Sequence, residues 1–317
     1  MMRARLETDS VPGSRLHTCG KLDLVIVVCL VTTNTLAKLH DGKKERHLKI
    51  IAIGDNVVDL YPADKKMFLG GHAANTAAFA TMMGLDSAYL GTFGNDARGD
   101  FARRTLIELG VDLSHSLQYD GPNAFTTMKI TTGKRHQTVG EPVQELQLSR
   151  DDIAYINTFD LVYLNNESGA DAFLSAITAP TIYDFSTIDD DRIFKKIAPQ
   201  IDLAYLSGKA KSDDDVEALC RRVAAAGCQR VVCSRGLRGS AALVADMMSW
   251  QQALGVKAVD ALGAGDAYIT CFAATLYSSQ KPTLDAKVSE SLSHAAKFAS
   301  AQVQLPGSFG HGATLIA

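Results

Sequence analysis

The segment DALGAGDAYITCF (residues 260–272) places an aspartate directly after a glycine-rich turn, where a helix is expected to begin. The first N–H groups of a helix have no acceptor within that helix, so the backbone of Gly263, Ala264 and Gly265 would bind an anion there. Asp266 would then accept the proton of a hydroxyl group that attacks a phosphoryl group. Taken alone, the motif fits equally well with an aspartate that caps a helix after a glycine turn.

A second glycine cluster, GGHAANTAA (residues 70–78), also opens an expected helix. Gly70 and Gly71 would let a ligand approach the backbone closely, and Asn75 would bond a substrate hydroxyl. The alternative is a tight turn followed by a capping asparagine.

Two aspartates, Asp55 and Asp59, follow the first apolar run, at the kind of strand end where open α/β sheets bind ligands.

Other site classes receive less support. The sequence contains neither G-x-x-x-x-G-K-[ST] nor G-x-G-x-x-G, so it predicts neither a P-loop nor a typical dinucleotide site. The histidines are dispersed, and we interpret His72 and His311 as loop residues rather than metal ligands.

These motifs lie in a chain whose short apolar runs alternate with helical stretches from Lys49 onward. Such alternation is typical of βαβ crossovers, and it predicts an α/β fold with a doubly wound, mainly parallel sheet and helices on both faces. A strand is also expected at residues 256–259, just before the aspartate motif. The other expected strands are residues 49–54, 87–94, 161–165, 181–185, 203–207 and 230–234. The expected helices include residues 73–84, 97–110, 264–279 and 283–303.

Two segments interrupt the alternation and predict a small β lid, from about residues 56–69 and 122–140. The second segment is rich in β-prone residues around Gly133, which indicates a hairpin. A further hairpin is expected at residues 240–253.

The composition is that of an ordinary globular protein, with 46% hydrophobic and 21% charged residues in a chain of 317. Its net charge of -3 provides no basic field for a phosphate backbone, so we expect no nucleic-acid partner. The six cysteines form no C-x-x-C pair, which is typical of a reducing compartment and favours a cytoplasmic location.

Residues 1–47 stand apart from this pattern, and we interpret them as an extension before a folded domain at residues 48–317. The apolar run at residues 24–31 is shorter than the roughly 20 residues that a membrane helix needs, so no membrane association is expected. With three arginines before it, the run loosely resembles a signal peptide, which is the alternative interpretation.

The two glycine motifs occur together in the PfkB family of carbohydrate kinases, which the sequence resembles from Lys49 to its end. This pairing is far more specific than either motif alone. SRGLRGS (residues 234–240) resembles the segment of that family that contacts ATP. Within the family, IGDNVVDLYP (residues 53–62) and YDFS (residues 183–186) most resemble the fructoselysine 6-kinases.

The resemblance implies a ribokinase-like fold, with a PfkB-type kinase domain at residues 48–317 and a β lid that closes over the sugar. It assigns Asp266 as the catalytic base, with the backbone of residues 263–265 as the anion hole for the transferred phosphoryl group. The residues that would hold sugar hydroxyls are Asp59, Gly70, Gly71 and Asn75. The residues that would line the nucleotide site are Ser207, Ser234, Gly236, Gly239 and His294.

The sequence departs from the family pattern at two places near the expected nucleotide. Ala261 replaces a usual threonine, which removes a hydroxyl close to the anion hole and to a frequent monovalent-cation site. The family segment N-x-x-E, whose glutamate organises Mg²⁺-bound water, falls at residues 207–210, where the sequence is SGKA. The protein groups that handle Mg²⁺ and any dependence on a monovalent cation are therefore left open.

The leading hypothesis is a kinase that uses ATP and Mg²⁺ to phosphorylate a primary hydroxyl of a ketose derivative, first of all the 6-OH of fructoselysine or a related fructosamine. One alternative keeps the chemistry and changes the acceptor to ribose, a nucleoside, fructose, 2-keto-3-deoxygluconate or a fructose phosphate. For a fructose phosphate, Arg98, Lys134 and Arg135 would pair the second phosphate. Another alternative is a sugar-binding regulator that has lost turnover. The resemblance also implies that the lid pairs two subunits into a homodimer.

Overall fold

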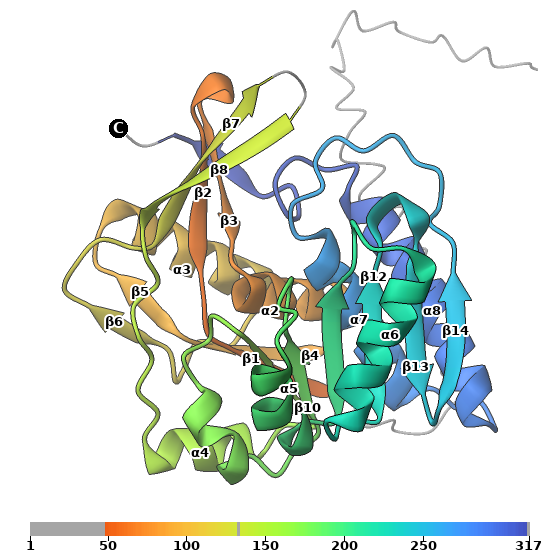
Figure 1. Cartoon of the computed structure of the whole chain (residues 1–317). Helices are drawn as coiled ribbons and strands as arrows, with labels where there is room; N and C mark the ends of the chain where they lie inside the picture. Colours follow the sequence, from red (N-terminus) through yellow and green to blue (C-terminus); the bar gives the residue numbers. More distant parts are fainter. Residues whose placement is uncertain (1–47, 132–133, 316–317) are drawn as a thin grey trace, which may run out of the picture. The chain divides into compact units, whose positions relative to one another are not determined.

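The computed structural model describes residues 48–131 and 134–315, and strands and helices alternate along most of this length (Figure 1). The extension at residues 1–47, and with it the signal-peptide alternative, lies outside the described residues. Within the described part of the chain, none of the helices combines the length and the apolar character that crossing a membrane would require.

The larger sheet of the described residues has eight strands in the order β14-β13-β12-β11-β10-β9-β1-β4. These strands are β1 (Lys49–Ile53), β4 (Asp86–Leu90), β9 (Leu161–Asn165), β10 (Thr181–Asp184), β11 (Leu203–Ser207), β12 (Arg230–Ser234), β13 (Ser240–Val244) and β14 (Met247–Gln251). Neighbours from β4 to β12 pair in parallel, whereas β12, β13 and β14 pair antiparallel. The hairpin predicted at residues 240–253 is therefore confirmed.

Helices cover both faces of this sheet because alternate residues of a strand point to opposite sides. In β1, Ile50 and Ala52 belong to one hydrophobic core, with residues of α2, α7 and α8. Ile51 and Ile53 belong to a second core, with residues of α5 and α6. The helices are α2 (His72–Met82), α3 (Ala97–Leu109), α4 (Arg150–Ile156), α5 (Asp191–Ile197), α6 (Asp213–Ala225), α7 (Ala264–Ser278) and α8 (Leu284–Gln302). Two helix layers on a mainly parallel sheet confirm the predicted α/β fold class.

A second sheet has five strands in the order β15-β3-β2-β7-β8, and all of them except β15 come from the segments predicted as a lid. Its strands are β2 (Val57–Tyr61), β3 (Lys66–Gly70), β7 (Phe125–Thr131), β8 (Lys134–Glu141) and β15 (Gly312–Thr314). β7 and β8 form the predicted hairpin, and β7 pairs in parallel with β2. A small cluster of Tyr61, Phe68 and Met128 packs this sheet against Leu262. Figure 1 shows the sheet above the start of α2, to which β3 leads directly.

The remaining elements are short. β5 (Thr92–Gly94) and β6 (Leu117–Tyr119) form a two-stranded sheet, and single 3-10 turns are η1 (Pro62–Asp64), η2 (Asp171–Ala176), η3 (Ala198–Gln200) and η4 (Gly236–Arg238).

One predicted strand is wrong, and two strands, β6 and β15, were missed. The single strand predicted at residues 87–94 is two strands, β4 and β5, which belong to different sheets. Residues 256–259 are irregular, and Val259 is 65% exposed instead of joining the buried sheet. Its N–H, like that of Asp260, bonds to the carbonyl of Val303 after α8, so the apolar run has no strand partner. Of the two missed strands, β15 is a three-residue segment containing Gly312 that lies against Phe68 of β3.

Candidate active site

Helix α7 begins at Ala264 after a turn whose geometry requires glycine at one position. Gly263, the residue before the helix, has a φ of 69°, and a Cβ on it would stand 2.7 Å from Cβ of Ser308. Before the turn, the carboxylate of Asp260 accepts the N–H of Leu262 at 3.0 Å. The first N–H groups of α7 have no acceptor within the helix, and its first acidic residue lies in the same turn.

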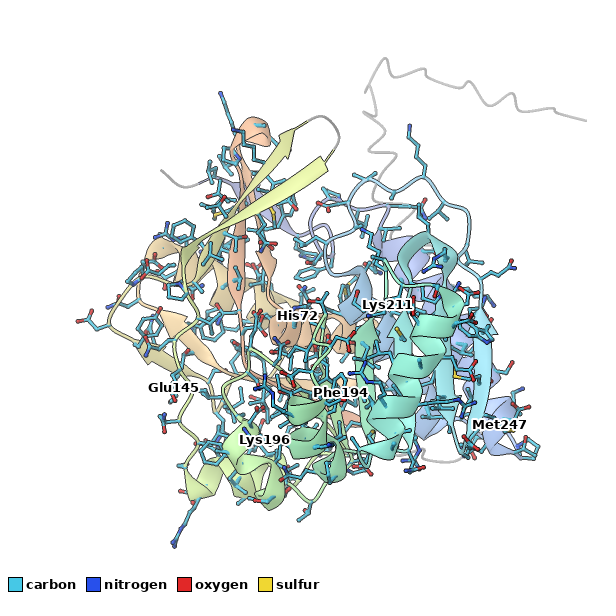
Figure 2. All side chains as sticks on the ribbon, viewed as in Figure 1. His72, Glu145, Phe194, Lys196, Lys211 and Met247 are labelled. Atoms are coloured by element: carbon cyan, nitrogen blue, oxygen red, sulfur yellow. The ribbon has the colours of Figure 1, made fainter. Side chains whose placement is uncertain are left out.

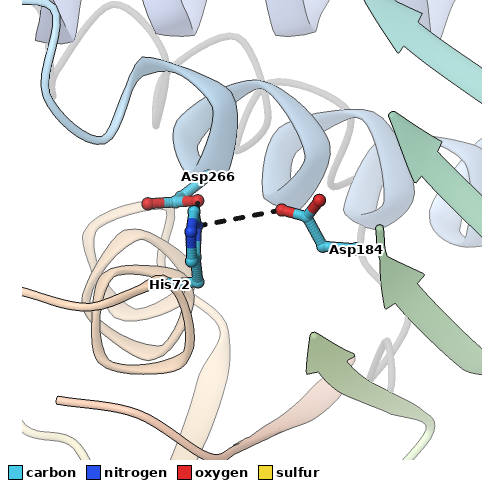
Figure 3. Close-up of side chains that lie close together, drawn as sticks. All are labelled: His72, Asp184 and Asp266. Carbon is cyan, nitrogen blue, oxygen red and sulfur yellow. Dashed lines mark hydrogen bonds and ion pairs between the residues drawn. The ribbon is translucent and has the colours of Figure 1, made fainter. Parts of the chain in front are cut away.

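That acidic residue is Asp266, and residues of α2 hold both of its carboxylate oxygens. Figure 3 shows one of these residues, His72, beside Asp266. Nδ1 of His72 lies 2.8 Å from Oδ1, and Nδ2 of Asn75 donates to Oδ2 at 2.7 Å. An ionised carboxylate only accepts, so the hydrogen of the first bond is carried by His72. Each oxygen keeps a lone pair beyond these bonds. Asp266 is thus buried, oriented and still able to accept a proton.

Asn75 presents a free acceptor beside this carboxylate. Its Oδ1 is buried and has no hydrogen-bond partner among the described residues, while its Nδ2 is bound to Asp266. A buried acceptor of this kind is normally satisfied by a ligand or by water. The arrangement suits the predicted contact between Asn75 and a sugar hydroxyl.

The start of α2 fixes where His72 stands. Gly71 precedes the helix with a φ of 96°, and the carboxylate of Asp55 accepts the N–H groups of His72 at 2.7 Å and Ala73 at 3.0 Å. Asp55 is itself held by Nδ2 of Asn165, at 2.7 Å, from the end of β9. Asp55, a candidate ligand by its position in the sequence, is therefore engaged as the cap of α2.

The second sheet contributes Asp59, which is buried on β2 against the last residue of β3. A Cβ on Gly70 would stand 2.1 Å from Oδ2 of Asp59, so only glycine leaves room for the carboxylate there. Thr126 of β7 donates to Oδ1 of Asp59 at 2.5 Å. The structure thus brings Asp59 and Gly70 together. Gly71 and Asn75 lie within the five residues that follow Gly70.

The electrostatics of the site centre on His72. Nδ1 of His72 also lies 3.9 Å from Oδ2 of Asp184, at the end of β10 (Figure 3). Burial lowers the pKa of His72, but the charge of Asp266, the bond to it, and the charges of Asp184 and Asp55 outweigh burial and raise that pKa well above 6.5. Burial raises the pKa of Asp184 to about 6, opposed by the charge of His72 and reinforced by that of Asp266.

The interpretation of His72 as a loop residue is wrong. It is the first residue of α2, its side chain is 34% exposed, and its Nδ1 bonds to Asp266; Figure 2 labels it near the middle of the view. The sequence does contain a sign of this role. His72 and Asn75 are three residues apart, so on a helix they share one face. Asp184 lies in the YDFS segment at the end of a predicted strand, but nothing in the sequence places that strand end beside a helix that starts 80 residues later.

A pocket of about 230 Å³ adjoins the start of α7 and has mostly apolar walls. Of the predicted nucleotide-site residues, Ser234, Gly236 and Gly239 line it, as do Ala264 and Gly265 of the predicted anion hole. The other lining residues are Lys209, Leu237, Ser240, Ala253, Leu254, Val256, Ala258, Ala261, Tyr268, Ala296, Ala299, Ser300 and Val303. An apolar slot that ends at helix N–H groups suits a flat base joined to an anionic chain.

Two predicted nucleotide-site residues do not line this pocket. Ser207 ends β11, where it pairs with Ser234 and donates its N–H to the carbonyl of Ser186. His294 lies on α8, and burial together with Lys297 and Lys281 lowers its pKa despite the opposing charge of Glu290. The α8 residues that line the pocket lie further along the helix, and they are Ala296, Ala299 and Ser300.

One residue near the anion hole was missed from the sequence. The hydroxyl of Tyr205, on β11, is buried without a hydrogen-bond partner among the described residues. A Cβ on Gly265 would stand 2.9 Å from this hydroxyl, so glycine at this position lets the start of α7 lie close to Tyr205. The tyrosine belongs to a predicted strand, but its apolar setting gave no reason to single it out.

His72, Asp184 and Asp266 each offer one metal-ligating atom, and these atoms lie within 4.8 Å of one another. Mg²⁺ prefers oxygen ligands, and Nδ1 of His72 is already bonded to Asp266. We therefore interpret the three residues as a hydrogen-bonded charge cluster.

Fold and site together define an α/β phosphotransferase, in which an aspartate, a helix N-terminus and an apolar pocket meet at the carboxyl ends of parallel strands. Residues 44–184 and 200–310 match the sequence model of the pfkB family of carbohydrate kinases. The chain belongs to this family, and it is accordingly an enzyme that transfers a phosphoryl group to a sugar hydroxyl.

Individual relatives agree with this placement. The chain is 28% identical to fructosamine kinase FrlD of Bacillus subtilis over 273 residues, which cover 84% of this chain and 94% of the relative. It is 31% identical to fructoselysine 6-kinase of Escherichia coli over 230 residues, which cover 70% and 87%.

Solved structures show the same fold. Ribokinase of Arabidopsis thaliana, complexed with ribose and ATP, superposes with a TM-score of 0.70 at 19% identity and covers 84% of this chain and 95% of its own. Fructokinase of Vibrio cholerae, bound to fructose, ADP and calcium, gives a TM-score of 0.67 at 20% identity, covering 83% and 95%. The ribokinase-like fold is therefore confirmed.

Proposed function

We propose that the protein transfers the γ-phosphoryl group of ATP to a primary hydroxyl of a ketose derivative, specifically the 6-OH of fructoselysine or a related fructosamine. The observation that carries this proposal is the position of Asp266. Its oriented carboxylate stands in the first turn of α7, one residue after Gly265, which lines the apolar pocket. This is where a base is needed when an acceptor hydroxyl meets a phosphoryl group at a helix end.

In the proposed reaction, Asp266 accepts the proton of the substrate hydroxyl as its oxygen forms a bond to the γ-phosphorus. The bond from that phosphorus to the ADP oxygen breaks, and ADP leaves with the electron pair. The N–H groups of Gly263, Ala264 and Gly265 would stabilise the charge on the phosphoryl oxygens. The free Oδ1 of Asn75 and the carboxylate of Asp59 would accept hydrogen bonds from sugar hydroxyls.

The nucleotide is proposed to occupy the pocket between η4 and α8. Ser234, Gly236 and Gly239 would line its sugar and base, and the orphaned hydroxyl of Tyr205 would donate to a phosphate oxygen near Gly265. Ser207 and His294 lie outside the pocket lining, so we assign them no contact.

The choice of a fructosamine as acceptor is supported by the two relatives, which match most of their length and are named for this substrate class. A fructose phosphate receives less support. Arg98, the described member of the basic cluster that would bind its second phosphate, is paired with Asp96 at 2.9 Å and stacked on Phe125. Lys134 and Arg135 have side chains outside the described part of the chain.

Mg²⁺ would accompany ATP and would neutralise its phosphate charge. Among the described residues that line the pocket, Lys209 carries a charge and none has a carboxylate. Because Mg²⁺ is usually bound by carboxylate oxygens, this lining does not fit as a set of Mg²⁺ ligands. We therefore assign no residue to the ion. Ala261, in the same lining, has no hydroxyl for a monovalent cation, and we assign no such cation to it.

We further propose that the second sheet is a lid that closes over the sugar, because Asp59 and Gly70 join it to the start of α2. Its closure would exclude water, which would otherwise compete as acceptor. A homodimer through this sheet and a cytoplasmic location remain predictions, as does the kinase domain boundary at residue 48.

The deciding experiment measures ADP release from ATP and Mg²⁺ with fructoselysine, fructose, ribose and a nucleoside as separate acceptors. We expect turnover with fructoselysine above all others. Turnover with another acceptor would keep the reaction and replace the substrate. Sugar binding without any ADP release would instead support a non-catalytic regulator.

A further inference from the structure

His72 stands among four carboxylates. Asp266 of α7 and Asp184 of β10 lie 2.8 Å and 3.9 Å from its Nδ1, and Asp55 accepts its backbone N–H. Glu167, after β9, has its pKa raised by burial and by the charges of Asp55 and Asp266, while the charge of His72 opposes them. Among these five described residues, His72 is the one that carries a positive charge when it is protonated.

This concentration of negative charge conflicts with the proposed function, on which the present inference rests. A nucleotide phosphate has to reach the start of α7, yet Asp266 and Asp184 would repel it if both were ionised and unopposed. His72 is also oriented for more than charge balance, since its Nδ1 fixes one oxygen of Asp266 while Asn75 fixes the other.

We propose that His72 is a positioning residue that, as an imidazolium, holds the Asp266 carboxylate in its reactive orientation and offsets the surrounding negative charge. The residue acts through Asp266 and does not itself receive the substrate proton. Its side chain is 34% exposed, so it exchanges protons with solvent directly.

A pH dependence follows from this arrangement. Asp266, Asp184 and Asp55 together keep His72 protonated above the pH at which a free imidazole loses its proton. When the pH rises through the raised pKa of His72, the cluster loses its positive charge, and turnover falls. The plot of kcat against pH should therefore have an alkaline limb that belongs to His72.

The first test compares kcat against pH for the wild type, His72→Asn and His115→Asn. Asparagine can still donate to Asp266 but carries no charge, so we expect kcat near neutral pH to fall roughly 10-fold or more and the alkaline limb to disappear. His115 is a matched control, because its Nδ1 bonds Asp152 at the same distance of 2.8 Å and its side chain is 28% exposed, away from this cluster. Its variant should keep the wild-type profile. An alkaline limb that persists in His72→Asn, or is missing from the wild type, overturns the proposal.

The second test needs no turnover and so separates this inference from the proposed function. Imidazole resonances of the ligand-free protein are titrated by NMR in the wild type and in Asp266→Asn. We expect the pKa of His72 above 6.5 in the wild type and lower in the variant. A wild-type value at or below 6.5, or one unchanged by Asp266→Asn, overturns the proposal. An inactive wild type with a raised His72 pKa would instead refute the kinase assignment alone.

Discussion

Asn75 donates from Nδ2 to Oδ2 of Asp266 over 2.7 Å, while its own Oδ1 is buried without a partner among the described residues. One side chain thus orients the base and presents an acceptor beside it. The base and the acceptor for the sugar are therefore coupled through a single amide group.

We expect Asn75→Ala to lose both contacts. A hydrogen bond to a charged group contributes about 1.5–3 kcal/mol, so kcat/KM should fall roughly 10- to 100-fold. Steady-state kinetics with the sugar varied will measure this, with thermal unfolding as the check that the fold is intact. A variant with wild-type kcat/KM would show that Asn75 serves only the packing of α2.

Asp266→Asn removes the proposed base but keeps the size of the side chain. If Asp266 accepts the hydroxyl proton, kcat should fall by about 10² to 10⁴. The decisive measurement is ADP release under saturating ATP and sugar, compared with Asp152→Asn as a carboxylate change away from the site. Near-normal turnover of Asp266→Asn would rule out general-base catalysis by this residue.

Tyr205→Phe should separate stability from binding. Its buried hydroxyl has no partner among the described residues, so removing it should leave the ligand-free protein as stable or about 1 kcal/mol more stable. If the hydroxyl binds a phosphate oxygen, the affinity for ATP should nevertheless fall roughly 10-fold. Urea unfolding and nucleotide titration test the two parts, and unchanged ATP affinity would remove Tyr205 from the site.

Asp184 should make the protein less stable as pH rises. Burial raises its pKa in the folded state to about 6, from an ordinary value of 3.8, so the native state binds this proton more tightly than the unfolded state does. The free energy of unfolding therefore falls between about pH 4 and pH 7, and Asp184→Asn should reduce that slope. Urea unfolding at pH 5 and pH 8 measures it.

Asp189→Asn provides the control for this comparison. Bonds from Lys211 and Arg222 lower the pKa of Asp189, so this group is ionised in both states across pH 5 to 8 and adds no slope there. An Asp184→Asn variant whose slope equals that of the wild type would show that Asp184 does not hold a raised pKa.

The sequence predicted those parts of the fold and site that local patterns encode. Apolar period and glycine position located β1, α2 and α7, because a strand, a helix and a turn each leave their mark on consecutive residues. The two glycine motifs also named Asp266 and Asn75, which the structure joins by a hydrogen bond.

What the sequence could not predict depends on contacts between distant elements. Asp184 and Tyr205 end or occupy ordinary buried strands, and their roles arise only because α7 starts beside those strands. Residues 256–259 have the composition of a strand but no neighbouring strand to pair with. The sequence pattern of a segment indicates which secondary structure it favours. Which strand it pairs with, and which distant residues it contacts, depend on the rest of the chain.

The hydrogen bond between Asn75 and Asp266 spans 191 residues, which has a consequence for how the enzyme is made. At about 5–20 residues per second, a ribosome completes α7 roughly 10 to 40 s after α2 has been synthesised. During that interval the largely buried α2, with Ala74, Ala77 and Phe79 among its residues, has no α7 to cover it. Each newly made molecule therefore passes through a partly folded, inactive state on the ribosome, in which chaperones and proteases have access to the helix that later supplies His72 and Asn75 to the active site.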